Sequence, residues 1–377
     1  MATLKSDAEI IEQIYAHIDN QTTDLGEGIW KEPTSNYTSD ERFAAELLLL
    51  KHLPVVFAPS VALTDPGSYV AHPVAGVPVI VVRDHDRTLK AFRNACRHRG
   101  VMLIEGQGRT NVFRCPYHGW AYGTDGTLQH VPHEAGFPAL DKCAYGLTEI
   151  HDVREVGGLV FVCLEEPVDD GALSDLPTLV PDDHLVFDYH EDEKNFNWKL
   201  NIEATLEGYH IKPTHEQTFY PYGYDNLNVV ENFGRNSRIT FPFRRIEDLR
   251  ETPADERDIV GKVTYVYNVF PIGTVAVLSN HISVLISEPV APGKTDYYSY
   301  RLGKLKGDET EERLEKMKRD ANFVADTGLA EDNAIVAKIQ RGLDSEANQY
   351  FTYGLYEKAI IQLLKNLDEL ISQPSQV

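Results

Sequence analysis

The sequence predicts an α+β protein of two domains, and three patterns lead to that expectation. At 377 residues the chain exceeds the size at which a single hydrophobic core usually stays undivided. Short runs rich in β-branched residues, such as VPVIVVR (77–83) and GLVFVCL (158–164), alternate with Gly/Asp turn clusters. Longer runs with helical periodicity fill residues 1–50 and the last quarter of the chain.

These patterns divide the chain into three segments. Residues 1–50 should form a helical part that packs with the C-terminal domain, residues 51–166 a small antiparallel β domain, and residues 167–377 that C-terminal, α+β domain. In the last segment we expect a helix at about 197–211, strands at 237–243, 262–269, 273–287 and 295–302, and helices at 308–326, 331–343 and 354–372.

Charge and hydropathy narrow the classes of partner. The formal net charge of −22 disfavours nucleic acid, whose phosphates would be repelled. No apolar run approaches the roughly 20 residues that span a bilayer. The acidic, amphipathic start MATLKSDAEIIEQIYAHI lacks the basic residues and apolar stretch of a secretion signal. We therefore expect a cytoplasmic protein with neither a nucleic-acid nor a membrane partner.

Two Cys–His pairs form the first metal motif. Cys96 and His98 have the spacing C-x-H, and Cys115 and His118 have the spacing C-x-x-H. In each pair one tight loop can direct both side chains at a metal. Zinc modules commonly pair Cys with Cys and His with His. The mixed pattern suits a Rieske 2Fe–2S cluster, in which two cysteines hold one iron and two histidines the other. A structural zinc site is the alternative.

A second ligand pattern lies in NWKLNIEATLEGYHIKPTHE. Glu207 and His210 recur at helical spacing beside an apolar face. Pro213 is expected to interrupt the helix, so that His215 can fold back toward the metal that His210 faces. An oxygen-activating iron needs two histidines and one carboxylate on one face, which leaves positions open for oxygen and substrate.

The carboxylate is expected from GLAEDNAIVAKIQRGL. Asp332 shares an apolar helical stripe with Ile335, Val336 and Ile339, whereas Glu331 points off that stripe. A carboxylate on a buried face is unfavourable unless it is paired or bound to a metal. An N-terminal helix cap is the other explanation for Asp332. With the histidine pair upstream, the ligand interpretation is preferred.

Together the motifs resemble those of the terminal oxygenase α subunits of Rieske-type non-haem iron oxygenases, the aromatic-ring-hydroxylating dioxygenase family. CRHRG with CPYHGWAY resembles the Rieske signature, while the NWK start, the E-x-x-H-x-x-x-x-H spacing and the ED…QRG segment resemble the catalytic domain. The resemblance implies a Rieske domain inserted in or beside a catalytic domain whose central antiparallel sheet is flanked by helices. It implies that His210, His215 and Asp332 hold the catalytic iron and that Glu207 is the carboxylate bridging the two kinds of centre.

The resemblance also implies a reaction. Electrons would pass through the 2Fe–2S cluster to a mononuclear Fe(II), which activates O2 to hydroxylate a small organic substrate, expected to be aromatic, as in aromatic hydrocarbon catabolism. Many ring hydroxylases have Asp at the position of Glu207, and Glu occurs in a branch that includes carnitine-type monooxygenases. The alternative is therefore a monooxygenase or oxidative demethylase acting on a non-aromatic or N- or O-methylated substrate. A Rieske electron carrier without oxygenase activity is the alternative from another class.

Partners follow from what the chain lacks. No flavin or nicotinamide fingerprint occurs, so electrons from NAD(P)H should arrive through a separate reductase, with or without a ferredoxin. The basic stretch 83–114 is a candidate dock for an acidic partner, and a solvated loop surface is the other explanation. The resemblance implies a homotrimer, with or without a small β subunit. In it Glu207 would hydrogen-bond His210 and a cluster histidine of the adjacent chain.

Overall fold

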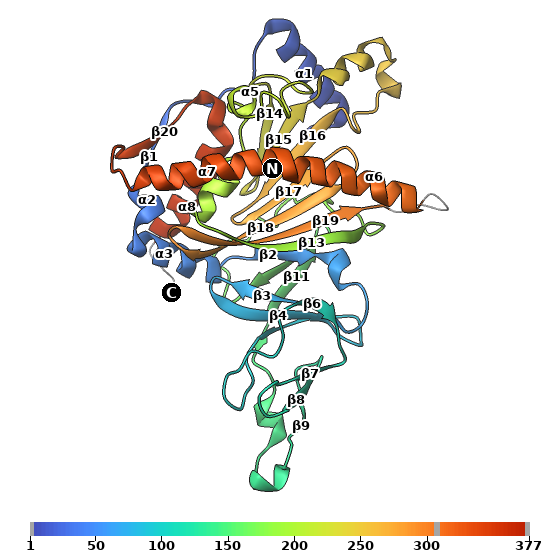
Figure 1. Ribbon diagram of the computed structural model, residues 1–377, viewed down its shortest axis with the longest axis vertical. Helices are drawn as coiled ribbons and strands as arrows, with labels where there is room; N and C mark the ends of the chain where they lie inside the picture. Colours follow the sequence, from blue (N-terminus) through green and yellow to red (C-terminus); the bar gives the residue numbers. More distant parts are fainter. Residues whose placement is uncertain (1–3, 305–309, 374–377) are drawn as a thin grey trace. The chain divides into compact units, whose positions relative to one another are not determined.

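The computed structural model describes residues 4–304 and 310–373, and its chain divides into two compact units (Figure 1). The larger unit takes the described parts of 1–49, 171–179 and 183–377, and the smaller unit takes 50–170 and 180–182. Each unit combines antiparallel sheets with helices or short helical turns, which confirms the α+β class. The domain boundaries expected above stay a prediction.

The larger unit is built on an antiparallel sheet that has seven strands within the uninterrupted stretch 4–304. In spatial order the strands are β13 (Leu185–Lys194), β19 (Lys294–Gly303), β18 (Ile282–Ala291), β17 (Gly273–Val277), β16 (Val263–Val269), β15 (Asn236–Pro242) and β14 (Val229–Phe233). A separate antiparallel pair joins β1 (Trp30–Pro33) and β20 (Tyr350–Tyr353). The single strand expected at 273–287 is wrong, because Ser279 and Asn280, both turn-favouring residues, separate β17 from β18.

Helices pack around this sheet. They are α1 (Asp7–Asn20), α2 (Ser35–Thr38), α3 (Asp40–Lys51), α4 (Trp198–Glu203), α5 (Ile211–Thr214), α6 (Thr310–Phe323), α7 (Ala330–Leu343) and α8 (Lys358–Ser372). Residues 308–309, the expected start of the 308–326 helix, lie outside the described residues. Among the helices that the structure describes, none combines the length and the apolar character that crossing a membrane requires.

One long helix organises the functional side of the larger unit. A π-helical turn, Val324–Leu329, joins α6 to α7, so the chain stays helical from 310 to 343. The long helix runs across the sheet (Figure 1), and Met317 on α6 packs against Gly303 at the end of β19. Single-turn π-bulges often mark functional sites. The metal ligand candidate Asp332 follows this turn in the first turn of α7.

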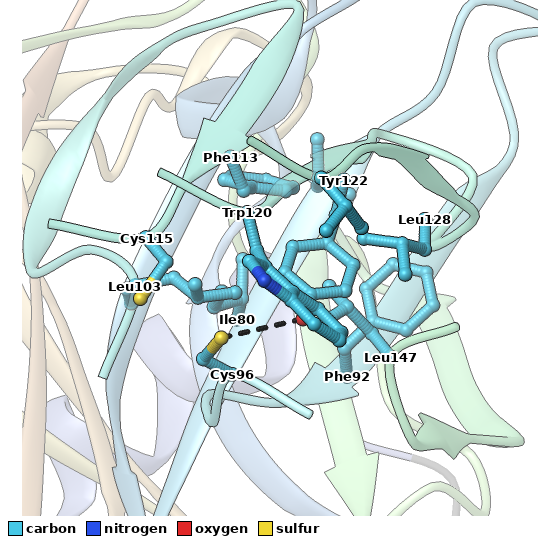
Figure 2. Packing of buried hydrophobic residues seen from close by; sticks show 13 residues of the cluster. Ile80, Phe92, Cys96, Leu103, Phe113, Cys115, Trp120, Tyr122, Leu128 and Leu147 are labelled. Carbon is cyan, nitrogen blue, oxygen red and sulfur yellow. Dashed lines mark hydrogen bonds between the residues drawn. The ribbon is translucent and has the colours of Figure 1, made fainter. Parts of the chain in front are cut away.

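The smaller unit contains three antiparallel sheets, with the strand orders β10-β5-β4-β3-β6, β11-β12-β2 and β7-β8-β9. The strands are β2 (Val55–Pro59), β3 (Ser68–Val74), β4 (Val77–Arg83), β5 (Leu89–Arg93), β6 (Gly106–Arg109), β7 (Val112–Arg114), β8 (Ala121–Gly123), β9 (Leu128–His130), β10 (Glu149–Ile150), β11 (Asp152–Val156) and β12 (Leu159–Cys163). A buried cluster that includes Phe92, Trp120 and Tyr122 surrounds Cys96 and Cys115 (Figure 2). The sulfur atoms of the motif are therefore held in a packed core.

Candidate metal centres

Two loops of the smaller unit carry the Cys–His motif, and they fold alike. One follows β5 and the other joins β7 to β8. In each loop the N–H of a glycine four residues after the cysteine donates to the cysteine carbonyl, from Gly100 to Cys96 at 2.8 Å and from Gly119 to Cys115 at 3.0 Å. Both glycines have positive φ, +76° and +75°, a conformation that glycine adopts without strain. Glycine after each histidine therefore closes a matching turn around each cysteine.

The four side chains of these loops converge. The Nδ1 atoms of His98 and His118 lie 3.2 Å apart, and His118 is exposed whereas His98 is half-buried. Cys96 and Cys115 are buried, and the His98 ring stacks on Trp120 with 5.0 Å between centroids. Burial raises the pKa of the Cys96 thiol, so a thiolate at this position needs a cation such as iron to stabilise it. Two buried thiols and two convergent imidazole nitrogens fit the mixed ligand set of a Rieske cluster.

Tyr122 is a residue of this centre that the sequence patterns did not single out. Its hydroxyl lies 3.3 Å from Sγ of Cys96, the contact that is dashed in Figure 2. The same hydroxyl oxygen accepts a 3.0 Å hydrogen bond from the N–H of Arg97. Burial raises the pKa of Tyr122 well above its ordinary value, so the hydroxyl keeps its proton and can donate to the sulfur. Hydrogen bonds to cluster sulfurs raise the reduction potential.

The second centre lies on a segment whose local structure differs from the expectation. The helix expected at 197–211 is wrong, because α4 ends at Glu203 and the chain turns before α5 begins at Ile211. The Glu207 carboxylate accepts hydrogen bonds from the N–H groups of Tyr209 and His210, which competes with a continuous helix. Pro213 is the third residue of α5, in the first turn, where no helical N–H is lost. The break therefore precedes His210.

His210, His215 and Asp332 come together in the larger unit. One ligand atom from each lies within 4.8 Å of the other two. Asp332 Oδ1 is 2.9 Å from His215 Nε2 and 3.5 Å from His210 Nε2. Although the His215 Nε2 atom is buried and close to Asp332, its geometry gives it no hydrogen bond among the described residues. An unsatisfied imidazole nitrogen aimed at a shared point fits a two-histidine, one-carboxylate iron site.

A carboxylate contacts the Nδ1 atom of each of these two imidazoles. Glu207 Oε1 makes a short contact with His210 Nδ1, and Glu331 Oε2 lies 2.7 Å from His215 Nδ1. The same Glu331 oxygen accepts a 2.7 Å hydrogen bond from Thr218. Burial lowers the pKa of both histidines, but the adjacent carboxylates outweigh burial and leave each pKa raised. Carboxylates at Nδ1 fix the imidazole tautomer and direct the Nε2 lone pairs toward one metal.

The environment of Asp332 corrects two expectations. Glu331 was expected to point off the apolar stripe that carries Asp332, yet its carboxylate also contacts the site, through Nδ1 of His215. The apolar stripe of Asp332 is only partly buried: Val336 is buried, whereas Ile335 is 40% exposed and Ile339 is 38% exposed. The helix-cap explanation fails, because the chain is already helical before Asp332. Its carboxylate faces the histidine pair.

A cavity of about 660 Å³ adjoins the second centre, and His210, His215 and Asp332 are among its lining residues. Its walls come from the sheet, the long helix and the segment 219–245, and they are largely apolar. The ring of Phe219 lies 4.9 Å from that of His215, and the ring of Phe323 lies 6.2 Å from Phe219. At Gly328 a Cβ atom would lie 2.0 Å from Phe219, so glycine in the π-helical turn makes room for this ring.

Comparisons with known proteins agree with both centres. Residues 54–143 match the family model "Rieske [2Fe-2S] domain", and residues 181–373 match "Ring hydroxylating alpha subunit (catalytic domain)". A carnitine monooxygenase oxygenase subunit of Acinetobacter pittii is 26% identical over 339 residues, which cover 84% of this chain and 86% of that protein. A glycine betaine monooxygenase oxygenase subunit of Chromohalobacter salexigens is 33% identical over 199 residues, 49% of this chain and 43% of that protein.

A solved quaternary ammonium Rieske monooxygenase has the same fold, with a TM-score of 0.76 at 21% identity over 98% of this chain and 100% of that one. Because residues 181–373 match a catalytic domain, the alternative of a Rieske electron carrier without oxygenase activity receives no support. The cofactors are a Rieske 2Fe–2S cluster and a mononuclear iron, as the sequence predicts. The chain belongs to the ring-hydroxylating α-subunit family and is a Rieske non-haem iron oxygenase.

Proposed function

We propose that this oxygenase hydroxylates a C–H bond next to the nitrogen of a methylated ammonium compound. One relative that matches 84% of the chain is named for carnitine, and another that matches 49% of the chain is named for glycine betaine. Glu207 agrees with this branch, whereas Asp is usual in ring hydroxylases. The aromatic substrate expected from the sequence receives no support from these relatives, and the alternative of a methylated, non-aromatic substrate is preferred.

One observation carries the proposal: three candidate iron ligands line an apolar cavity with aromatic walls. The ring of Phe219 lies close to His215, and the ring of Phe323 lies near those of Phe219 and Tyr222, 6.2 and 6.3 Å between centroids. Faces of aromatic rings attract quaternary ammonium groups. A methylated nitrogen held among these rings would bring its C–H bonds toward the metal ligands.

We assign a role to each site residue. Cys96, His98, Cys115 and His118 hold the 2Fe–2S cluster, and His210, His215 and Asp332 hold the mononuclear iron. This iron, when bound, supplies the activation of O2. Glu207 orients His210 through Nδ1 and is the bridging carboxylate toward the cluster of a neighbouring subunit.

The proposed reaction balances as a monooxygenation. One atom of O2 enters a C–H bond on a carbon attached to nitrogen, and the other leaves as water after two electrons and two protons are taken up. The product carries a hydroxyl group on that carbon. Its C–N bond then breaks, the hydroxyl oxygen becomes the carbonyl oxygen of an aldehyde, and the amine leaves with the released proton.

Electrons come from a separate reductase, and the ion pairs of the basic stretch leave fewer residues as candidates for its docking site. Four of the eight basic residues in the stretch 83–114 form ion pairs, which are Arg83–Glu155, Lys90–Asp84, Arg93–Glu165 and Arg109–Asp65. Arg97, Arg99 and Arg114 have no carboxylate partner among the described residues, and we propose them as the contact for an acidic reductase or ferredoxin.

We propose a homotrimer in which the cluster of one subunit reduces the iron of the next. The solved structure of the quaternary ammonium Rieske monooxygenase is described as revealing insights into inter-subunit electron transfer in that protein. A small β subunit and a cytoplasmic location stay expectations. Glu207→Gln should keep both metals and slow electron transfer between the centres. Equal single-turnover rates for the variant and the wild type would reject the bridging role.

The substrate class is tested with the metal-loaded protein, a surrogate reductase and 18O2. Carnitine, glycine betaine and choline are compared with naphthalene and benzoate, and oxygen uptake is scored against labelled product. We expect uptake coupled to an 18O-labelled aldehyde from at least one ammonium compound. Coupled oxidation of the aromatic compounds alone would refute the proposed substrate class and favour ring hydroxylation.

A further inference from the structure

The carboxylates that line the cavity have charged or hydrogen-bonding partners, whereas two of its arginines have no carboxylate partner among the described residues. Its carboxylates are Glu207, Asp320 and Asp332. Glu207 and Asp332 contact the candidate iron ligands, as described above. Asp320 Oδ2 lies 2.8 Å from Nδ1 of His281, a buried histidine. Burial raises the pKa of Asp320, but contacts with His281 and Asn280 outweigh it and leave the pKa lowered. Each carboxylate of the cavity thus already has a partner.

Two arginines line the same cavity without a carboxylate partner. The guanidinium of Arg244 lies over the rings of Tyr220 and Tyr224, 5.3 Å from each centroid. Arg245 lies 4.7 Å from the centroid of Phe243 and donates to Ser279 Oγ at 2.8 Å. Neither guanidinium forms an ion pair in the part of the chain that the structure describes, and both residues are exposed. Ring contacts therefore fix two cations whose charge is not neutralised.

Neighbouring arginines of the same unit behave differently. Arg238 pairs with Glu231 at 2.6 Å, Arg257 with Glu12 at 2.6 Å, and Arg235 with Glu369 at 2.7 Å. In a chain with a net charge of −22, carboxylates are abundant enough to meet most surface cations. Arg244 and Arg245 therefore differ from these three arginines, and both are among the residues that line the cavity.

The arginines and the iron ligands come from different elements. His210, His215 and Asp332 belong to the α5 region and α7, whereas Arg244 and Arg245 follow β15, next to the turn between β17 and β18. The lining of the same cavity also includes Phe219, Tyr222 and Phe323. A ligand that reaches both groups would place an apolar or cationic part along these rings and an anionic part at the guanidinium groups.

We propose that Arg244 and Arg245 form a carboxylate-binding subsite, so that the substrate is an ammonium compound carrying a carboxylate rather than a simple cationic alcohol. The proposal rests on the proposed function and deepens it. Guanidinium groups bind carboxylates through charge-assisted, often bidentate hydrogen bonds. The subsite favours zwitterions such as betaines over choline. Its two positive charges attract the substrate carboxylate, which the negative net charge of the protein would otherwise repel.

The test measures binding to the metal-loaded protein by calorimetry, with two probe pairs that differ at the carboxylate: glycine betaine against choline, and benzoate against benzamide. Arg244→Gln and Arg245→Gln are compared with Arg257→Gln, whose ion pair with Glu12 lies outside the cavity lining. We expect the wild type to prefer the carboxylate of a pair, and each cavity variant to raise the dissociation constant of that carboxylate about tenfold or more. For the member of each pair without a carboxylate, and for the Arg257→Gln variant, the dissociation constant should change less than twofold (about 0.4 kcal/mol).

The outcomes separate the two proposals. Binding of glycine betaine that weakens in Arg244→Gln and Arg245→Gln supports both the carboxylate subsite and the ammonium substrate class. Arginine-dependent binding of benzoate alone supports the carboxylate subsite and contradicts the ammonium substrate class. Equal losses of affinity for the two members of a pair, with and without the carboxylate, or a wild type that prefers neither carboxylate, would overturn the subsite.

Discussion

Glu331 Oε2 lies 2.7 Å from Nδ1 of His215, on the side of the ring opposite the Nε2 atom that faces Asp332. His210 has the same relationship with Glu207. Each candidate iron-binding imidazole is thus held between a metal-facing nitrogen and a carboxylate. One of the two carboxylates precedes the histidines in sequence, and the other is the residue before the third ligand.

This relationship predicts that Glu331→Gln weakens iron binding. The amide still fills the space, but it removes the negative charge that makes His215 a stronger ligand, and carboxylates at this position typically contribute about 10- to 100-fold in metal affinity. The measurement is the ferrous-iron dissociation constant under anaerobic conditions. Glu216→Gln, an exposed neighbour, is the matched control. Unchanged affinity in Glu331→Gln would show that the contact does not act on the metal.

Tyr122→Phe should lower the reduction potential of the Rieske cluster. The hydroxyl next to Cys96 Sγ stabilises the more negative, reduced cluster, and one hydrogen bond of this kind corresponds to about 50 mV for a one-electron couple. Redox titration followed by electron paramagnetic resonance gives the value. Tyr69→Phe, which packs on the same core through Phe113, should leave the potential within about 10 mV. Equal shifts in the two variants would exclude a role for the sulfur contact.

Gly328→Ala should damage substrate binding without removing the metals. The added methyl group would overlap Phe219, whose ring contacts His215, so this ring must move within the cavity. Overpacking of this kind costs about 1–3 kcal/mol, and we expect a loss of about tenfold or more in kcat/KM. Gly342→Ala on the same helix has open space around its Cβ and serves as the control. Identical kinetics in both variants would contradict the role of Phe219.

A buried carboxylate outside the metal centres predicts a pH dependence of stability. Burial raises the pKa of Glu203 from 4.5 to about 7, although the hydroxyls of Tyr353 and Tyr37 both donate to it. The folded protein therefore holds this proton more tightly than the unfolded chain. Its contribution is fully favourable below about pH 4.5 and is lost as the pH rises through about 7.

Glu203→Gln removes this titration. Between pH 5 and pH 8 the wild type should lose about 2.5 kcal/mol of unfolding free energy that the variant keeps. Urea unfolding of the metal-loaded proteins at both pH values measures the difference. Parallel pH profiles for the two proteins would mean that Glu203 is already ionised throughout this range.

Local patterns predicted the ligand types but not their surroundings. The spacing of Cys96, His98, Cys115 and His118 requires only two short loops, so sequence alone could indicate their convergence. Helical periodicity could not locate the break after Glu203. The position of the break depends on the hydrogen bond that the Glu207 carboxylate accepts from the N–H of His210 and on the tertiary position of His210. The same periodicity places Glu331 off the apolar stripe, but it cannot show that the Glu331 carboxylate contacts His215, which lies 116 positions away in the chain.

Long-range relationships lie beyond sequence patterns altogether. The contact between Tyr122 and Cys96 links residues 26 positions apart, and the pairing of Asp320 with His281 links α6 to the start of β18. Ser279 and Asn280 could have marked the hairpin between β17 and β18, since both residues favour turns. Ion pairs of the basic stretch, such as Arg83 with Glu155, depend on strands far apart in the chain.

The most direct test of two iron centres with the proposed ligands is metal and sulfide analysis of the reconstituted protein and of His215→Ala. The wild type should contain about three iron atoms and about two acid-labile sulfides per chain, with the reduced-state resonance of a Rieske cluster. His215→Ala should keep the sulfide and the resonance and lose about one iron. A wild type without labile sulfide, or a variant that retains its full iron content, would contradict the account.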